Sequence, residues 1–194
     1  MRWAEFKDIM GRGFGRGTCP HQLAFLLSFG LRRLILSPEK LAERLALAEA
    51  SRVVELGPGP GYFSRAVAHR IPKGYLLLAD LQREMLGKAR ARLRESGFRN
   101  VGFVQASAAC LPLPSGAWDC VFLVAVLGEV PDPESCLREV NRVLRPGGLL
   151  SLTEQPGDPD FVPLPDARKL AEGMGFRLER VYGGGKNYTA NFRK

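Results

Sequence analysis

Apolar residues after position 50 fall into five short runs separated by amphipathic segments. The runs, at 52–56, 75–80, 101–105, 119–126 and 148–154, are rich in leucine and β-branched residues, with apolar side chains in succession rather than in alternation. Such strands are buried on both faces, as in a parallel sheet covered by helices on each side. Helical spacing predicts the intervening helices at 62–70, 82–96 and 133–144, the last ended by Arg145-Pro-Gly-Gly148. The pattern predicts an α/β, doubly wound core.

The end of the chain departs from this rhythm. After a predicted helix at 165–174, two further runs at 176–182 and 188–193 are joined by the short segment Gly183-Gly-Gly-Lys-Asn187. Two strands joined so closely form a hairpin, and the strands of a hairpin are antiparallel. We therefore expect a seven-stranded sheet whose last strand is antiparallel to the others.

The residues before the first strand form a separate N-terminal extension. Four glycines in the seven residues 11–17 indicate a flexible arm. Apolar residues then recur at helical spacing from Leu23 to Leu36, and Ser37-Pro-Glu begins a second helix that should run to about Ala48. We interpret residues 1–49 as an arm and helical lid over the strand ends, and 50–194 as the core. Alternatively, the first helix lies on a membrane surface with Arg32 and Arg33 at the headgroups.

Composition restricts the class of protein. The chain has 194 residues, of which 45% are hydrophobic and 25% charged, and these values exclude a disordered or collagen-like chain. Its four cysteines include no C-x-x-C pair, so we expect buried thiols in a reducing compartment. With two histidines and scattered cysteines, we expect no metal site. The absence of a secretory pattern and of a long apolar stretch predicts a cytoplasmic location.

The net charge of +8 is concentrated in residues 1–36, 83–99 and 167–194. These segments predict a solvated basic surface, with a polyanion site as the alternative. The arm at 11–17 is similar to a short Arg-Gly-rich RNA-contacting tract, but no helix-turn-helix or basic run with interleaved aromatics accompanies it.

The first strand runs directly into a glycine-rich turn, Gly57-Pro-Gly59-Pro-Gly61. Glycines allow backbone to approach a ligand at the carboxyl end of this strand, where open α/β sheets bind ligands. The dinucleotide fingerprint G-x-G-x-x-G fits poorly, because Tyr62 stands in place of its third glycine. A purely structural turn is the alternative. Three glycines alternating with two prolines soon after an acidic residue, Glu55, favour a binding site.

Asp80 ends the second apolar run. A carboxylate at the tip of this strand accepts hydrogen bonds from both hydroxyls of a ribose and repels a 2′-phosphate, which predicts an adenosine-type nucleoside. The alternative is that Asp80 only caps the helix that starts near Gln82.

Five motifs, by their order and spacing, resemble the class I S-adenosylmethionine-dependent methyltransferases of the type 11 branch, which includes ubiquinone and menaquinone biosynthesis enzymes. The motifs are Glu55-Leu-Gly-Pro-Gly-Pro-Gly61, Asp80, Leu111-Pro-Leu-Pro with Trp118-Asp119, Val130-Pro-Asp-Pro and Leu144-Arg-Pro-Gly-Gly148. The resemblance covers about residues 50–193. It implies a Rossmann-like seven-stranded sheet with an antiparallel last strand, and S-adenosylmethionine as the cofactor.

The resemblance also implies roles for individual residues. Gly57, Gly59 and Gly61 would line the methionine moiety, and Glu55 would orient their loop or reach the α-amino group through water. Asp80 would hold the ribose, and Leu81 would pack on the adenine.

Further along the chain, the resemblance places Val124 and the two residues after it against the sulfonium and the substrate. Two positions depart from the family. Ser107 stands where members commonly carry an acid for the adenine amino group, and a hydroxyl is a weaker acceptor, while the Ala108 backbone N–H stays available to the ring. Glu129 stands near a position where members often carry histidine, so the resemblance assigns no base.

A sulfonium is an activated methyl donor, so such an enzyme has chiefly to align the acceptor and exclude water. If the acceptor must lose a proton, His21, Glu129 and Tyr62 are the candidates, and none is assigned. His21 is better interpreted as a polar residue of a helical first turn than as a base, and His69 fits the C-terminal end of its helix.

The predicted function is methyl transfer to a small or lipid-like acceptor, because the chain has no long insertion after its fifth strand beyond 156–165. The alternatives are a nicotinamide-dependent oxidoreductase and a non-catalytic module that binds the cofactor or contacts nucleic acid.

Overall fold

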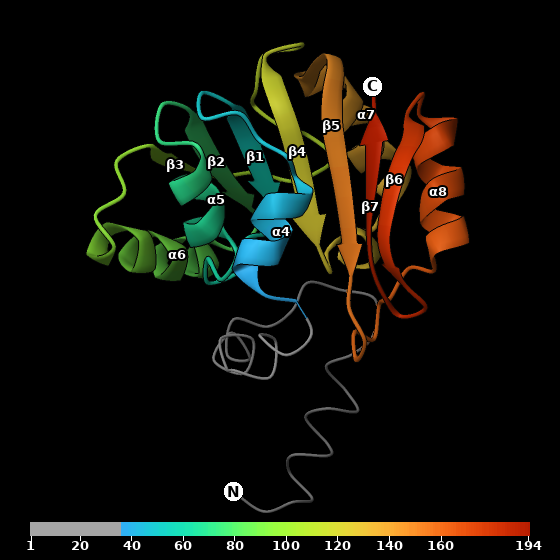
Figure 1. Ribbon diagram of the computed structural model, residues 1–194, viewed down its shortest axis with the longest axis horizontal. Coiled ribbons are helices and arrows are strands. Elements are labelled where there is room, and N and C mark those ends of the chain that lie inside the picture. Colours follow the sequence, from blue (N-terminus) through green and yellow to red (C-terminus); the bar gives the residue numbers. More distant parts are fainter. Residues whose placement is uncertain (1–35) are drawn as a thin grey trace, which may run out of the picture.

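The computed structural model describes residues 36–194, which fold around one seven-stranded sheet (Figure 1). The spatial order of the strands is β3-β2-β1-β4-β5-β7-β6. Neighbouring strands from β3 to β5 pair in parallel, and β7 is antiparallel to both β5 and β6. The strands are β1 (Arg52–Leu56), β2 (Tyr75–Asp80), β3 (Val101–Gln105), β4 (Trp118–Val124), β5 (Leu144–Glu154), β6 (Arg177–Gly184) and β7 (Asn187–Arg193). The predicted fold class is confirmed.

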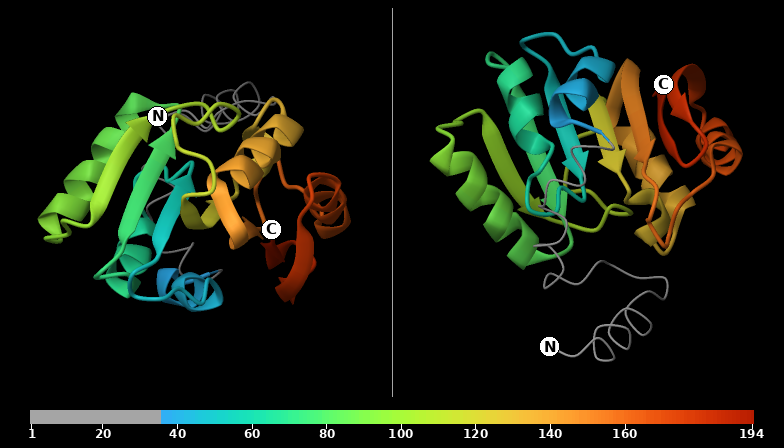
Figure 2. Two further views of the ribbon diagram at one scale, coloured as in Figure 1. Left: turned by 90° about the horizontal axis from the view of Figure 1, so that it is seen from above. Right: turned by 60° about the horizontal axis from the view of Figure 1, so that its bottom comes forward.

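Helices cover both faces of the sheet, as Figure 2 shows for α4 and α7, which lie on opposite sides of it. The helices are α4 (Pro38–Arg44), α5 (Ser64–Arg70), α6 (Arg83–Glu95), η2 (Leu127–Glu129), α7 (Pro133–Val143) and α8 (Leu164–Gly173). Apolar residues of α4, α5 and α6 share one buried cluster with β1, β2 and β4, and those of α7 and α8 share the other with β5 and β7. None of the helices in residues 36–194 is long and apolar enough to cross a membrane.

Several element bounds differ from the predictions for local reasons. The helix that Ser37 caps ends at Arg44 rather than near residue 48, and Ala46 beyond it has a positive φ of 47°. Strand β5 begins at Leu144, so Arg145-Pro-Gly-Gly148 lies within a strand and not in a turn after the helix. A shift of register in the β4–β5 pairing, between Trp118 and Cys120, accommodates this segment.

The cysteine prediction is partly wrong. Cys120 and Cys136 are buried, but Cys110 lies exposed in the loop after β3. Cys19, His21, the arm at 11–17 and the helix predicted from Leu23 lie outside the described residues. The division of the chain at residue 50 stays a prediction, although α4 packs on the core: Leu41 and Leu45 belong to the same buried cluster as Val53 and Phe122.

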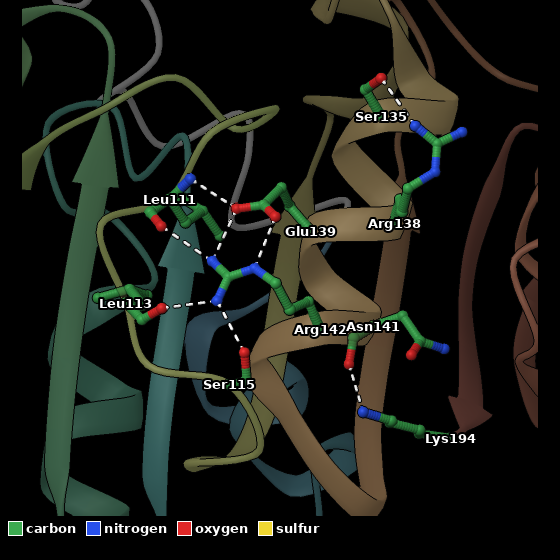
Figure 3. Close-up of polar contacts among 9 residues, drawn as sticks. All are labelled: Leu111, Leu113, Ser115, Ser135, Arg138, Glu139, Asn141, Arg142 and Lys194. Atoms are coloured by element: carbon green, nitrogen blue, oxygen red, sulfur yellow. Dashed lines mark hydrogen bonds and ion pairs between the residues drawn. The ribbon is translucent and has the colours of Figure 1, made fainter.

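Arg142 of α7 fixes the loop that leads into β4 (Figure 3). Its guanidinium donates to the carbonyl oxygens of Leu111 (3.0 Å) and Leu113 (2.8 Å) and pairs with Glu139 (2.7 Å). Glu139 in turn accepts from the backbone N–H of Leu111 at 2.8 Å. The pair therefore satisfies backbone groups of a loop that pairs with no strand of the sheet.

Replacing Arg142 with lysine should lower the stability of the fold by about 1–2 kcal/mol, because an ammonium cannot reproduce the fork that bonds two carbonyls and a carboxylate. Thermal unfolding should show the loss as a fall of roughly 2–8 °C in Tm. Arg138→Lys is the matched control, since Arg138 on the same helix makes one 3.3 Å bond to Ser135. Equal Tm values for the two variants would contradict the role given to Arg142.

Candidate functional site

The turn between β1 and α5 lies at the carboxyl edge of the sheet and depends on its glycines. Gly57, Gly59 and Gly61 have φ values of 63°, 52° and 76°, a region that other residues rarely adopt. A Cβ on Gly57 would lie 2.5 Å from the Val126 side chain, and one on Gly61 would lie 3.1 Å from Ala89. A Cβ on Gly59 would have no atom within 4 Å. The turn is therefore packed at both ends and open at its centre, where a ligand would lie against bare backbone.

Asp80 connects the end of β2 with this turn. Asp80 is 9% exposed, and its carboxylate accepts hydrogen bonds from the backbone N–H groups of Gln82 (2.8 Å), Gly59 and Leu81. Burial raises the pKa of Asp80, and the three backbone bonds partly offset that rise. The bond to Gln82, the residue before α6, holds the start of the turn into the helix, but α6 itself has no side-chain cap, so the predicted alternative of Asp80 as a helix cap is not supported. The bond to Gly59 shows that the same carboxylate also lies at the open centre of the glycine turn.

The adjoining ends of β2 and β3 are joined by two hydrogen bonds. Ala106 N–H donates to the Asp80 carbonyl at 3.1 Å, and the Gln105 side chain donates to the Leu81 carbonyl at 3.0 Å. Leu81 is 54% exposed, so its side chain offers an apolar surface on which a flat ring can pack.

Ser107 and Ala108 follow β3 at this edge. Ser107 is exposed, and its hydroxyl accepts from Ala109 N–H at 3.2 Å within its own turn. The hydroxyl oxygen of Ser107, a weak acceptor, already accepts one hydrogen bond. It is therefore less able to accept a bond from an adenine amino group than the acid that family members commonly carry here.

Glu55, in β1 just before the glycine turn, is a buried residue that is 3% exposed. It accepts a hydrogen bond of 2.5 Å from the hydroxyl of Ser64, the first residue of α5. Burial raises the pKa of Glu55 to about 8, with the hydroxyl bond lowering it and the nearby Asp80 charge raising it. Glu55 thus orients the turn by joining β1 to α5. Ser64 was not predicted, because the sequence places the start of this helix at residue 62 and the structure places it at Ser64.

The buried Glu55 should make the fold less stable as pH rises. The folded protein keeps this proton up to a pKa of about 8, whereas an exposed glutamate releases it near 4.5. Between these values the folded state binds more protons than the unfolded chain, so stability falls from about pH 5 to pH 8. Glu55→Gln should reduce the fall in Tm between pH 6 and pH 8 by a few degrees. An unchanged slope in thermal unfolding across this range would show that the carboxyl is not neutral in the fold.

The end of β4 closes the site on the third side. Val124 is half-buried, and Val126 lies beside Gly57. Between them, Ala125 has a positive φ of 54° and donates its N–H to the Thr153 carbonyl at 2.8 Å. Val124 is thus the last residue of the strand that pairs with β1, and its contact with the sulfonium stays a prediction.

The described candidate bases, Glu129 and Tyr62, lie on different elements. Glu129 is half-buried in η2, and Tyr62 packs edge-on against Phe63 with ring centroids 4.8 Å apart. His69 is exposed in the last turn of α5. Among residues 36–194 no cluster of three or more histidine, cysteine or acidic side chains suits a metal ion. Glu154 and Gln155, at the end of β5, are buried polar residues that the sequence did not indicate.

Comparison with known proteins decides the family. A family model described as a methyltransferase domain matches residues 54–152, a range that includes the glycine turn, Asp80 and most of β5. The chain belongs to this family. The predicted resemblance to class I S-adenosylmethionine-dependent methyltransferases of the type 11 branch is thereby confirmed.

Two similar relatives are each named ubiquinone/menaquinone biosynthesis C-methyltransferase UbiE. That of Hahella chejuensis is 34% identical over 131 residues, which are 66% of this chain and 52% of the relative. That of Vibrio cholerae serotype O1 is 42% identical over 108 residues, 53% of this chain and 40% of the relative. The chain thus spans about half the length of these methyltransferases. A crystal structure of an S-adenosylmethionine-dependent methyltransferase from Aquifex aeolicus has the same fold, with a TM-score of 0.84, 22% identity, and coverage of 91% of this chain and 99% of that one.

Proposed function

We propose that this protein transfers a methyl group from S-adenosylmethionine to a small or lipid-like acceptor. The observation that carries the proposal is the contact between Asp80 and the glycine turn. The carboxylate accepts the Gly59 N–H at the one position of the turn where a Cβ would meet no atom. A nucleoside with a positively charged amino-acid tail fits this arrangement, because the sugar hydroxyls suit Asp80 and the tail suits bare backbone.

The residues that would hold the cofactor are those that the family resemblance implies. Asp80 would bind the ribose, Leu81 would pack on the adenine, and Gly57, Gly59 and Gly61 would line the methionine moiety. Ser107 and Ala108 would contact the edge of the adenine, and Val124 would border the sulfonium. Glu55 would act on the turn through Ser64 and not on the cofactor directly. Bound S-adenosylmethionine supplies an activated methyl group, so the protein has to position the acceptor and exclude water.

We further propose that the acceptor is related to the quinones. The support is the name of the two relatives, which act in ubiquinone or menaquinone biosynthesis and methylate carbon. The cytoplasmic location and the lid formed by residues 1–49 stay predictions. A nicotinamide-dependent oxidoreductase is not favoured by the family, and contact with nucleic acid through the basic segments is untested.

Methyl-labelled S-adenosylmethionine and a prenylated 1,4-naphthoquinol test this function. We expect label in the extracted lipid with the wild-type protein, and loss of most of it with Asp80→Asn. Cofactor binding without labelled lipid would contradict the acceptor class, and a protein that binds no S-adenosylmethionine would contradict the whole proposal.

A further inference from the structure

The carboxyl end of β5 holds buried polar atoms that the cofactor site does not use. Glu154 is 2% exposed and Gln155 is 3% exposed. Within the described part of the chain, Glu154 Oε2 and both polar atoms of the Gln155 amide have no hydrogen-bond partner. Buried polar atoms are nearly always paired, because leaving one unpaired costs folding free energy. Three such atoms on consecutive residues indicate a place where a ligand supplies the partners.

We propose that Glu154 and Gln155 form the acceptor subsite, and that this subsite takes a neutral molecule whose head carries hydroxyl or carbonyl oxygens. The inference rests on the methyl transfer proposed above and names the residues that recognise the acceptor. A glutamine amide offers one acceptor and two donors, which match a hydroxyl and a carbonyl on the same ring.

The position of the pair suits an acceptor beside the cofactor site. Strand β4 lies between β1, which carries the glycine turn, and β5. Ala125 at the end of β4 donates to Thr153, the residue before Glu154, at 2.8 Å. Neighbouring strands are about 4.8 Å apart, so the ends of β1 and β5 are roughly 10 Å from each other. A ring that contacts Glu154 or Gln155 and extends across the end of β4 therefore reaches the glycine turn.

One oxygen of Glu154 is already held in place. It accepts the backbone N–H of Val162, and the Val162 carbonyl accepts the hydroxyl of the buried Tyr188 at 2.7 Å. These bonds tie the segment 156–163 to the end of the sheet and leave Oε2 for a ligand.

The surrounding charges select against an anionic acceptor. Glu129 from η2, Asp158 from the segment after β5 and Tyr188 from β7 lie near Glu154, and Asp166 of α8 lies near Tyr188. Burial first, and then the carboxylates of Asp158 and Glu129, raise the pKa of Glu154 to about 8. Glu154 therefore carries its proton at neutral pH and would donate it to a bound acceptor. Above pH 8 it becomes an anion and this donor is lost.

Two probes of equal ring size, 4-hydroxybenzamide and 4-hydroxybenzoate, test the proposal. Their binding is measured by calorimetry on protein saturated with S-adenosylhomocysteine. We expect the neutral amide to bind at least about 10-fold more tightly than the carboxylate, because like charges are repelled. Gln155→Leu should weaken binding of the amide by roughly 5-fold or more and leave the Kd of S-adenosylhomocysteine unchanged. The same variant should raise the Tm of the free protein, since it removes a buried unpaired amide; Gln155→Met serves if the leucine variant does not fold.

Wild type should bind 4-hydroxybenzamide more weakly above pH 8, because Glu154 then loses its proton. Glu154→Gln should bind the amide as tightly as wild type at pH 7 and should not lose affinity above pH 8 for this reason. Asn191→Leu is the matched control: Asn191 is another buried amide with an unpartnered oxygen in residues 36–194, but it lies on β7 and should affect Tm alone. Equal binding of the two probes, no binding of either to wild type, or an unchanged affinity in Gln155→Leu would overturn the inference. Failure of S-adenosylhomocysteine to bind would instead overturn the proposed function.

Discussion

Replacing Asp80 with asparagine should weaken the binding of S-adenosylmethionine and S-adenosylhomocysteine by about 1.5–3 kcal/mol, or roughly 10- to 150-fold in Kd. The reason is that a carboxylate forms charge-assisted hydrogen bonds with two ribose hydroxyls, whereas an amide offers one weaker acceptor and a donor that conflicts with the Gly59 and Leu81 N–H groups. Calorimetry on the purified variant measures the change, and circular dichroism confirms that it is folded.

Asp119→Asn is the control for loss of a carboxylate that bonds to the backbone. Asp119 accepts from Arg52 N–H at 2.7 Å and pairs with Arg145 at the opposite, amino end of β4. Its replacement should lower Tm and leave both Kd values within about twofold. Cofactor affinity that is equal in wild type and Asp80→Asn would remove Asp80 from the site and leave it only the backbone bonds at the end of β2.

Gly57→Ala should be the most destabilising single change in the turn. The new Cβ would lie 2.5 Å from Val126 and would occupy a residue with a φ of 63°. Overpacking costs about 1–3 kcal/mol and the left-handed conformation about 1–2 kcal/mol, so we expect a fall of roughly 5–15 °C in Tm. Gly59→Ala has the conformational cost alone, because no atom lies near its Cβ, and should lower Tm by only a few degrees.

Cofactor binding should distinguish the two alanine variants in the other direction. Gly59→Ala should lose more affinity than Gly57→Ala for each degree of Tm that it loses. A methyl group on Gly59 projects into the open centre of the turn, so Gly59→Ala should bind S-adenosylhomocysteine at least about 10-fold more weakly although its fold is nearly intact. Adding Val126→Ala to Gly57→Ala should restore part of the Tm by removing the overlap. If Gly59→Ala binds as wild type does, the ligand does not lie at the centre of the turn.

Prediction from sequence succeeded where a pattern is local. The bounds of β1, β2 and β3 were predicted correctly, because each is a short apolar run that ends at a turn or a polar residue. The conformation of the glycine turn and the place of Asp80 at the end of β2 were predictable for the same reason, because both depend on neighbouring residues in the sequence.

Prediction failed where burial depends on elements far apart in the chain. Glu154 and Ser64 are buried only because β5 pairs with β7 and because α5 packs over β1, and no local spacing indicates either. Cys110 was expected to be buried as an apolar residue, but the loop after β3 leaves it exposed. The early end of α4 likewise depends on the conformation of Ala46, which the sequence does not predict.

The most direct test of the central claim is a crystal structure of the protein with S-adenosylhomocysteine. We predict both ribose hydroxyls within about 2.6–3.0 Å of the Asp80 carboxylate, the amino-acid tail along Gly57–Gly61 and the adenine against Leu81. A thioether bound elsewhere, or a ribose whose hydroxyls do not touch Asp80, would contradict the account.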